Sequence, residues 1–256
     1  MRAGTLVGAA VLLGAGSAAA HVAPSERENN RYVVLAPVGD RLRLAYVVYM
    51  GEEPGRAARA RIDRDRDGTI SDDEAQRYAG EVAAQVAPRL AVTVDSAAVP
   101  VRWHSADLGI DDRSTAAGSF AIDLVAWFCF DRAAAAHTVR FQDRFDLPTP
   151  GESELRAEES PGIAVTRSTL GAEPAAATRP RLDFRWRGGP GPAAQGYELD
   201  FTVDPGRATF LGPCPPPMSA PKAPRRRWPF VLAIGAVMVL AALAVRWKIV
   251  RARTGS

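Results

Sequence analysis

The sequence lacks the short motifs of the common enzyme classes. It has no G-x-S-x-G nucleophile elbow, no H-E-x-x-H zinc-binding helix, no phosphate-binding loop and no G-x-G-x-x-G dinucleotide fingerprint. Histidine and cysteine are scarce as well, with three and two copies among 256 residues. These absences predict a protein that is not an enzyme and has no catalytic residues.

Acidic residues are missing from the C-terminal end of the chain. Residues 221–256 contain eight basic residues and no acidic ones, whereas residues 21–220 contain 23 basic and 29 acidic residues. The formal net charge of +3 therefore comes from the C-terminal end, and the body of the protein is acidic. Because an acidic body gains nothing from neutralising phosphates, we expect no nucleic-acid partner.

The first 20 residues have the pattern of a secretory signal peptide. Arg2 supplies a charged start, residues 6–13 form a short apolar run, and small residues at 17–20 suit cleavage before His21. The apolar run is too short to span a bilayer comfortably. We therefore predict that residues 1–20 are removed and that the following domain is exported.

A second apolar run lies near the C-terminus. Residues 228–245 carry no charge, and their length is the shortest that crosses a bilayer as a helix. Basic residues flank the run on both sides, so the signal peptide rather than the positive-inside rule orients it. We predict a single-pass type I protein of the cell membrane with an extracytoplasmic domain, a proline-rich stalk at 212–227, a transmembrane helix at 228–245 and a basic cytoplasmic tail at 246–256.

Between these signals, residues 21–211 are predicted to form one mainly β domain. A hydrophobic share of 47% and a charged share of 24% are typical of globular proteins. Apolar and polar residues alternate in several segments, as in strands with one buried face. These segments are 32–36, 41–50, 90–94, 99–103, 120–130, 139–145, 182–186 and 197–203. About eight short strands separated by turns predict an immunoglobulin-like β-sandwich.

The turn residues predict how these strands are connected. Asp95-Ser96 is expected to make a hairpin of the strands beside it, and the Gly-Pro-rich segment 188–192 is expected to join the last two strands as a pair. Residues 148–180 are polar and rich in proline and alanine. We expect them to form a long loop with one weak strand at 163–167.

One helix–loop–helix is expected to interrupt the strands at residues 54–88. Pro54 suits the first turn of a helix, and the Ala/Arg-rich segment 55–62 follows it. Apolar residues at 75, 78, 79, 82 and 86 then lie on one face of a second helix that ends at Pro88.

The loop between these helices matches the calcium-binding loop of an EF-hand. The expected ligands are Asp63, Asp65 and Asp67 through their carboxylates, Thr69 through its backbone carbonyl, Ser71 through a water, and Glu74 through both carboxylate oxygens. Gly68 permits the sharp turn, and Ile70 is expected to pack against neighbouring structure. Since clustered carboxylates repel one another without a cation, we predict bound Ca²⁺ rather than a solvated acidic turn.

The chain contains a single loop of this kind. A lone hand outside the cell is expected to bind calcium weakly, in the range of about 10⁻⁴–10⁻³ M that is typical of extracellular modules. Mg²⁺ fits less well, because it keeps several waters in a smaller octahedral shell. The ion is therefore predicted to be structural, or to permit an interaction, rather than to act as a signal.

The histidines and cysteines leave two questions open. His21 would be the mature N-terminus, where its amine and imidazole could chelate copper or nickel together with His104 or His137. The competing interpretation places His104 and His137 at the ends of strands. Cys129 and Cys214 both lie in the exported part, where a disulfide is allowed, but the bond depends on a Cα distance that sequence does not give.

Part of the exported domain resembles a known family. The matching features are His21, Asn30-Arg-Tyr32, the segments 40–46 and 50–54, the acidic loop, and the strand 138–143. They are similar to the extracytoplasmic N-terminal domain of HupE/UreJ-like, nickel/cobalt-transporter-like membrane proteins. That family continues into a multi-helix transporter, whereas this chain has one predicted span, so transport activity is not implied. The resemblance implies a calcium-carrying sandwich beside a membrane, as an accessory to a metal permease.

Together these features predict a non-enzymatic, calcium-binding ectodomain that is anchored to the membrane and presents a surface to a partner such as a metal permease. The alternative is an accessory protein that delivers nickel, cobalt or copper to a permease through His21. A third possibility is a surface protein whose ion only holds the fold together.

Overall fold

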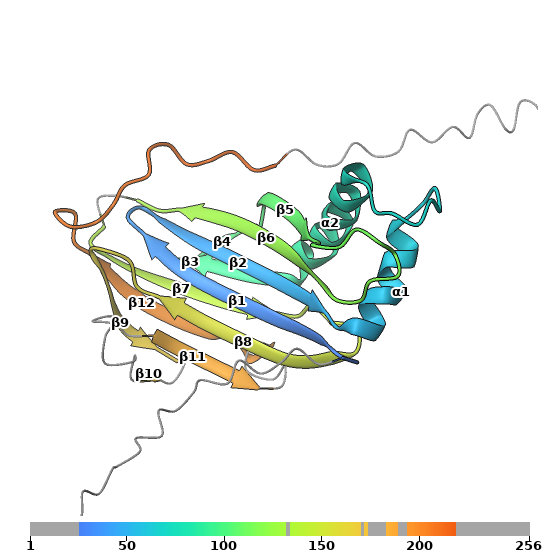
Figure 1. Cartoon of the computed structure of the whole chain (residues 1–256). Coiled ribbons are helices and arrows are strands. Elements are labelled where there is room, and N and C mark those ends of the chain that lie inside the picture. The colour runs from blue at the N-terminus through green and yellow to red at the C-terminus, as the bar shows by residue number, and fades with distance from the viewer. Residues whose placement is uncertain (1–25, 132–133, 170–171, 174–182, 189–193, 219–256) are drawn as a thin grey trace, which may run out of the picture. The chain divides into compact units, whose positions relative to one another are not determined.

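The computed structural model describes residues 26–131, 134–169, 172–173, 183–188 and 194–218 (Figure 1). The chain divides into two compact units, Met1–Pro216 and Pro217–Ser256, and the helices and strands below belong to the first. The predicted signal peptide, His21, the predicted span at 228–245 and the predicted tail lie outside the described residues. Within the described ranges, no helix is long and apolar enough to cross a membrane.

Strands dominate the described residues and form two sheets, which confirms the predicted mainly β architecture. The first sheet has seven strands in the order β10-β11-β8-β1-β2-β6-β5, and the second has five in the order β4-β3-β7-β12-β9. The first sheet contains β1 Asn29–Val38, β2 Arg41–Met50, β5 Trp103–Gly109, β6 Phe120–Cys129, β8 Pro150–Glu158, β10 Ala172–Glu173 and β11 Asp183–Gly188. The second contains β3 Leu90–Val94, β4 Ala97–Val99, β7 Ala136–Asp143, β9 Ile163–Ser168 and β12 Tyr197–Val203. Figure 1 shows β1, β2 and β6 in front of β3, β7 and β12.

Three neighbouring strands of the first sheet, β1, β2 and β6, are ten residues long each. The turn between β1 and β2 contains Gly39 at φ = +58°, a conformation that glycine adopts without a Cβ clash. β2 pairs antiparallel with β6 along its whole length, from Arg41 opposite Cys129 to Met50 opposite Phe120. These two register pairs mark opposite ends of the sandwich, roughly 30 Å apart at the usual rise of a strand.

The core lies between the two sheets, where the alternating apolar residues point inward. Fully buried side chains include Leu35, Leu42, Leu44, Tyr46, Ile122 and Leu124 of the first sheet and Phe141 and Phe201 of the second. One buried ion pair crosses the core: Arg31 Nη1 lies 2.5 Å from Asp143 Oδ2, and the Tyr46 hydroxyl donates to the same oxygen at 2.9 Å. Burial, followed by the charge of Asp143, raises the pKa of Tyr46 well above its usual value. The hydroxyl therefore stays a donor, and the network links β1 and β2 to β7.

The predicted loop at 148–180 is wrong in part. Its first half forms β8, which pairs parallel with β1 and lies inside the first sheet. Leu155 and Ala157 are its buried apolar residues, and glutamates and an arginine stand between and beside them. Such low apolar content gives only a weak strand signal in the sequence. Backbone pairing to β1 contributes much of what holds this strand in the sheet. The weak strand predicted at 163–167 is present as β9.

The predicted pairing of the last two strands is also wrong. β11 lies in the first sheet, antiparallel to β8, whereas β12 lies in the second sheet between β7 and β9. The hairpin around Asp95-Ser96 exists, but its second strand is the short β4, and Trp103 begins β5 in the other sheet. Alternation identifies the buried face of a strand but not its neighbour, because both sheets bury apolar faces against the same core.

Two helices close the end of the sandwich where β2 leaves the sheet. α1 spans Glu52–Ile62 and α2 spans Asp72–Val86, with a 3₁₀ turn at Ala87–Arg89, so the helices lie where the sequence predicts them. α2 is fixed to β5 by two side chains. Trp103 Nε1 donates to the Ala83 carbonyl at 2.8 Å, and the Gln76 amide donates to the Ala106 carbonyl at 3.1 Å.

The opposite end is closed by a disulfide and by residues 212–214, which we call the strap. Cys129, the last residue of β6, is bonded to Cys214, with Cα atoms 6.2 Å apart. The buried Arg41 donates to the carbonyls of Gly212 at 2.5 Å and of Pro213 at 3.2 Å. The first residues of the predicted stalk are therefore held against the first sheet.

Candidate metal centre

The acidic loop joins the two helices with both of its ends fixed. At the end of α1, the Asp63 backbone N–H still donates to the Arg59 carbonyl at 3.1 Å. At the start of α2, the Ser71 hydroxyl accepts from the Glu74 N–H at 3.4 Å, and the Glu74 carboxylate accepts from the Ser71 N–H at 3.1 Å. This capping box satisfies two backbone donors that a helix start leaves without partners.

Inside the loop, three aspartates accept hydrogen bonds from backbone N–H groups further along the chain. Asp63 Oδ2 accepts from Gly68 at 3.0 Å, Asp65 Oδ1 from Asp67 at 3.2 Å, and Asp67 Oδ1 from Thr69 at 2.7 Å. Gly68 has φ = +88°, so the loop needs glycine there for its backbone conformation, although a Cβ would meet nothing within 4 Å. These bonds fix the orientation of the three carboxylates.

The three aspartates converge on one point. One carboxylate oxygen from each of Asp63, Asp65 and Asp67 lies within 4.8 Å of the other two. Asp63 is 8% exposed, and its Oδ1 is buried without a hydrogen-bond partner. A buried carboxylate oxygen without a partner is costly, and a cation between the three side chains would supply that partner. Carboxylate oxygens are the ligands that Ca²⁺ prefers, so these residues fit the ion.

Glu74 lies next to this cluster but is not one of its converging groups. Its carboxylate is buried, with Oε1 accepting from the Arg64 N–H at 2.6 Å and Oε2 accepting from the Ser71 hydroxyl at 2.8 Å. The Arg64 N–H, followed by the Ser71 groups, lowers the pKa of Glu74 to about 2, so the side chain is ionised at neutral pH. Ligation through both oxygens, as the loop pattern predicts, requires the carboxylate to give up some of these bonds.

The pKa of Asp65 reflects the concentrated negative charge of the acidic loop. The backbone N–H of Asp67 lowers the pKa of Asp65, but desolvation and the charges of Asp67 and Glu74 outweigh it, so that the pKa is raised. A raised carboxylate pKa means that the surroundings resist a further negative charge. A bound cation would remove that resistance.

The middle of the acidic loop pairs with the segment between β5 and β6. Thr69 forms an antiparallel bridge with Ser114, and the Ile70 N–H donates to the Arg113 carbonyl at 2.8 Å. Ile70 is fully buried, as predicted. Of the two other predicted ligands, Thr69 thus lies in this bridge, and Ser71 caps α2. The pairing braces a loop that has no second calcium loop beside it in the sequence.

Arg59 of α1 holds in place the segment between β5 and β6, which we call the brace. It is 1% exposed and donates to four backbone carbonyls at 2.6–3.1 Å, and its guanidinium lies 5.4 Å from the centre of the Phe120 ring. The four carbonyls belong to Asp112, Ser114, Gly118 and Ser119. A Cβ on Gly55, one turn earlier, would lie only 2.6 Å from the Gly118 oxygen, so helix and segment are in close contact.

Arg113 completes the brace from the other side. Its guanidinium donates to the Ile70 carbonyl at 3.0 Å and to Asp72 Oδ1 at 2.5 Å. Neither arginine could be singled out from the sequence, because arginine in a polar loop or an Ala/Arg-rich helix usually lies on the surface. One signal was available for Arg59: it shares a helix face with Gly55 and Ile62, which are four residues before it and three after it.

The two described histidines are engaged within the fold. His104 Nδ1 accepts from the Trp127 N–H at 3.1 Å, so Nε2 carries the proton and donates to the Pro215 carbonyl at 2.8 Å. His137 Nδ1 lies 2.8 Å from Asp95 Oδ2, and its ring packs against Phe130 with centroids 4.4 Å apart.

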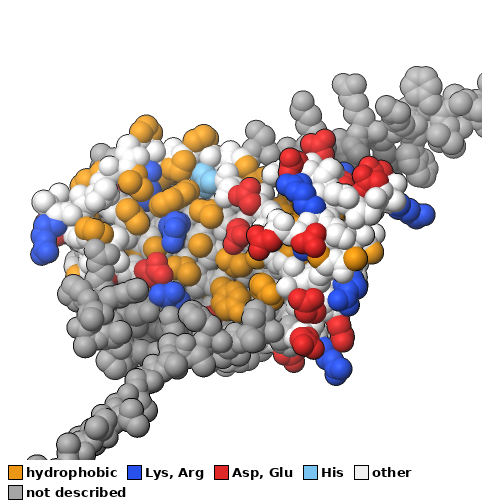
Figure 2. All heavy atoms as spheres, viewed as in Figure 1, with side chains coloured by type: hydrophobic (Ala, Val, Ile, Leu, Met, Phe, Trp, Pro, Cys, Tyr) orange, Lys and Arg blue, Asp and Glu red, His pale blue; other side chains and the backbone are white. Residues whose placement is uncertain are grey.

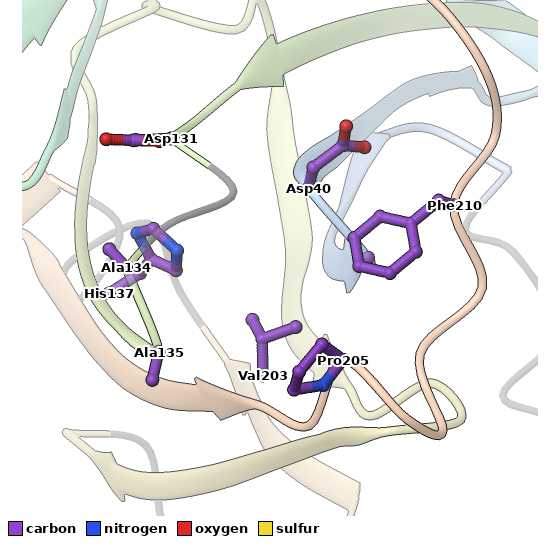
Figure 3. Close-up of a pocket in the computed structure, with 9 residues that line it drawn as sticks. Asp40, Asp131, Ala134, Ala135, His137, Val203, Pro205 and Phe210 are labelled. Carbon is purple, nitrogen blue, oxygen red and sulfur yellow. The ribbon is translucent and has the colours of Figure 1, made fainter.

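His137 also borders a cavity of about 80 Å³ at the strap end of the sandwich (Figure 3). Asp40, Asp131 and Phe210 are among the other lining residues. Among the described residues, only the acidic loop brings three metal-ligating side chains together. His21 lies outside the described residues, so a transition-metal site that combines it with His104 or His137 stays a prediction.

The chain matches no protein-family model and no curated protein.

Proposed function

We propose that the protein binds one Ca²⁺ ion in the loop at residues 63–74. The observation that carries the proposal is the buried Asp63 Oδ1, which has no hydrogen-bond partner and belongs to a group of three converging carboxylates. The proposed ligands are Asp63, Asp65, Asp67, Thr69 through its carbonyl, Ser71 through a water, and Glu74. The ion supplies positive charge that neutralises these carboxylates.

We propose a structural or interaction-permitting role for the ion and no catalytic role. The loop is connected through the Thr69–Ser114 bridge and Arg59 to the segment that leads into β6. A bound ion would thus order the two helices and this segment together. Such a coupling supports a surface whose shape depends on calcium, without a reacting group in it.

We further propose that this immunoglobulin-like sandwich is exported and anchored to the cell membrane as a type I protein. The signal-peptide pattern, the apolar run at 228–245 and the Cys129–Cys214 disulfide support the proposal, because disulfides persist in oxidising compartments. The resemblance to the N-terminal domain of HupE/UreJ-like proteins favours a metal permease as the partner.

Calorimetric titration of calcium into the chelator-stripped full chain tests the ion site. We expect one site with a Kd of about 10⁻⁴–10⁻³ M, and no measurable binding in Asp63→Asn or Glu74→Gln. Asp73→Asn is the matched control, since Asp73 is an exposed acid of the same helix start and is not a proposed ligand. The proposal fails if the wild type gives neither heat nor a shift in Tm at millimolar calcium.

A further inference from the structure

The outward faces of the two sheets differ in chemistry. On the second sheet, the outward residues of β7 and β12 are polar: Thr138, Arg140, Gln142, Glu198, Asp200 and Thr202. On the first sheet, most outward residues of β1, β2 and β6 are apolar and partly exposed: Tyr32, Val34, Ala45, Val47, Tyr49, Ala121, Val125 and Trp127. We call this second set the apolar face. Figure 2 shows hydrophobic side chains gathered over these strands.

A contiguous apolar area of this kind marks an interaction surface rather than ordinary exposed side chains. Three ten-residue strands span about 34 Å by 14 Å, a footprint of roughly 480 Å². A partner in a standard protein–protein interface buries about 800 Å². The face is therefore more than half of what a partner buries in a standard interface, a size that suits a weak or transient contact.

Two charged sites stand on this face. Arg43 of β2 lies opposite Trp127, and Asp123 of β6 lies opposite Val47 on one side and Asp107 of β5 on the other. Along β2, Arg43 and Val47 are separated by four residues, with Ala45 between them. One end of the apolar face is therefore basic and the other is acidic.

Neither charge is well satisfied within the described chain. Arg43 Nε is buried without a hydrogen-bond partner, and its ion pair with Glu158 is long, at 4.0 Å. Asp123 and Asp107 are like charges placed directly across a strand pair, an arrangement that is destabilising. Burial, followed by the charge of Asp107, raises the pKa of Asp123. Each site would gain from a group of opposite charge brought by a partner.

We infer that the apolar face binds a second copy of this chain in a symmetric, face-to-face dimer. Consider a two-fold axis that runs across the strands along the row Val34–Ala45–Val125, which the strand register defines. This rotation places the row of Arg43 in one copy opposite the row of Asp123 in the other, twice per dimer. Within β1, β2 and β6 the face is thus complementary to itself in both charge and apolarity, as an isologous interface requires.

Cross-linking of the full chain tests this geometry. Ala45 lies on the proposed axis, so Ala45→Cys should be joined to its partner copy by a short bismaleimide, giving a covalent dimer in membranes. Ala91→Cys is the matched control, because Ala91 is an exposed alanine on the outward face of the second sheet. A dimer that forms equally from Ala91→Cys, or from neither variant, would overturn the inference. So would a cross-link of Ala45→Cys to a different protein.

Charge reversal tests whether Arg43 and Asp123 pair across the dimer. It also distinguishes this dimer from one that forms through the apolar run at 228–245. Sedimentation of the detergent-solubilised chain should show a dimer whose Kd rises by about tenfold or more in Arg43→Glu and in Asp123→Arg. The double variant Arg43→Glu/Asp123→Arg should recover most of the lost affinity. Circular dichroism checks that each variant is folded. A wild type that is monomeric at all concentrations, or a double variant weaker than either single one, would refute the dimer.

Discussion

β2 and β6 run side by side from one end of the sandwich to the other, and the two ends are held by different forces. At the Arg41–Cys129 end, a disulfide and buried arginine–carbonyl bonds fasten the chain. At the Met50–Phe120 end, the acidic-loop end, two helices and the braced acidic loop close the sandwich, and three carboxylates of that loop converge where a cation could bind. The first end should hold under all conditions that keep the disulfide, whereas the order of the second should depend on calcium.

Removing the disulfide is the largest expected change. The bond joins residues that are 85 apart in sequence, and the entropy of closing such a loop corresponds to about 4–5 kcal/mol of stability. Cys129→Ser/Cys214→Ser should therefore lower the free energy of unfolding by about that amount, as measured by urea denaturation. Its calcium affinity should stay within about twofold of the wild type, because the loop lies at the other end of the strands. A large loss of calcium affinity would mean that the two ends are coupled.

The next largest change should follow from removing Arg59, the buried clamp at the acidic-loop end of the sandwich. Arg59→Met leaves four carbonyls without their donor, and we expect a loss of about 2–4 kcal/mol of stability. Because those carbonyls belong to the segment that braces the loop, calcium binding should weaken by about tenfold as well. Urea denaturation and calorimetry measure the two effects.

Arg56→Met is the control for this clamp. Arg56 lies on the same helix, but its side chain is 56% exposed and its ion pair with Glu52 is long, at 3.9 Å. Exposed pairs of this kind contribute about 0–1 kcal/mol. Equal effects of the two substitutions would show that Arg59 has no special role in the brace.

The two ends also differ in how far their sequences predict them. The acidic-loop end is built from local signals: Ser71 and Glu74 form a capping box three residues apart, and Asp63 to Glu74 are contiguous. Local patterns of this kind give both the helices and the loop. The brace is not local, because Arg59 meets carbonyls about 53–60 residues away, and no periodicity records such contacts.

The sheets show the same limit. Alternation located most strands, but it missed β8, which has few apolar side chains and whose pairing with β1 joins residues about 120 positions apart. The pairing of Cys129 with Cys214 depended likewise on a distance between remote residues. The convergence of Asp63, Asp65 and Asp67 could be predicted from sequence, whereas the bond from the Arg64 N–H to the Glu74 carboxylate could not.

Arg113 should give the smallest effect and the sharpest test of the brace, because two consequences of its removal oppose each other. Arg113→Gln removes a positive charge near the acidic loop, which by itself would strengthen the attraction for calcium. It also removes the bond to the Ile70 carbonyl, which should loosen the loop and speed the release of the ion. Since the side chain of Arg113 is 49% exposed, the charge effect is screened by solvent and salt, and we expect the loosening to dominate.

The expected result is a calcium off-rate that is faster by several-fold in a stopped-flow chelator experiment, with a change in stability of less than about 1 kcal/mol. Arg61→Gln reports the charge effect alone, because Arg61 is an exposed residue in the last turn of α1. Slower release from Arg113→Gln, matching that from Arg61→Gln, would mean that charge and not bracing controls the loop. The acidic loop would then be held by its capping box and a bound ion alone, without help from the segment between β5 and β6.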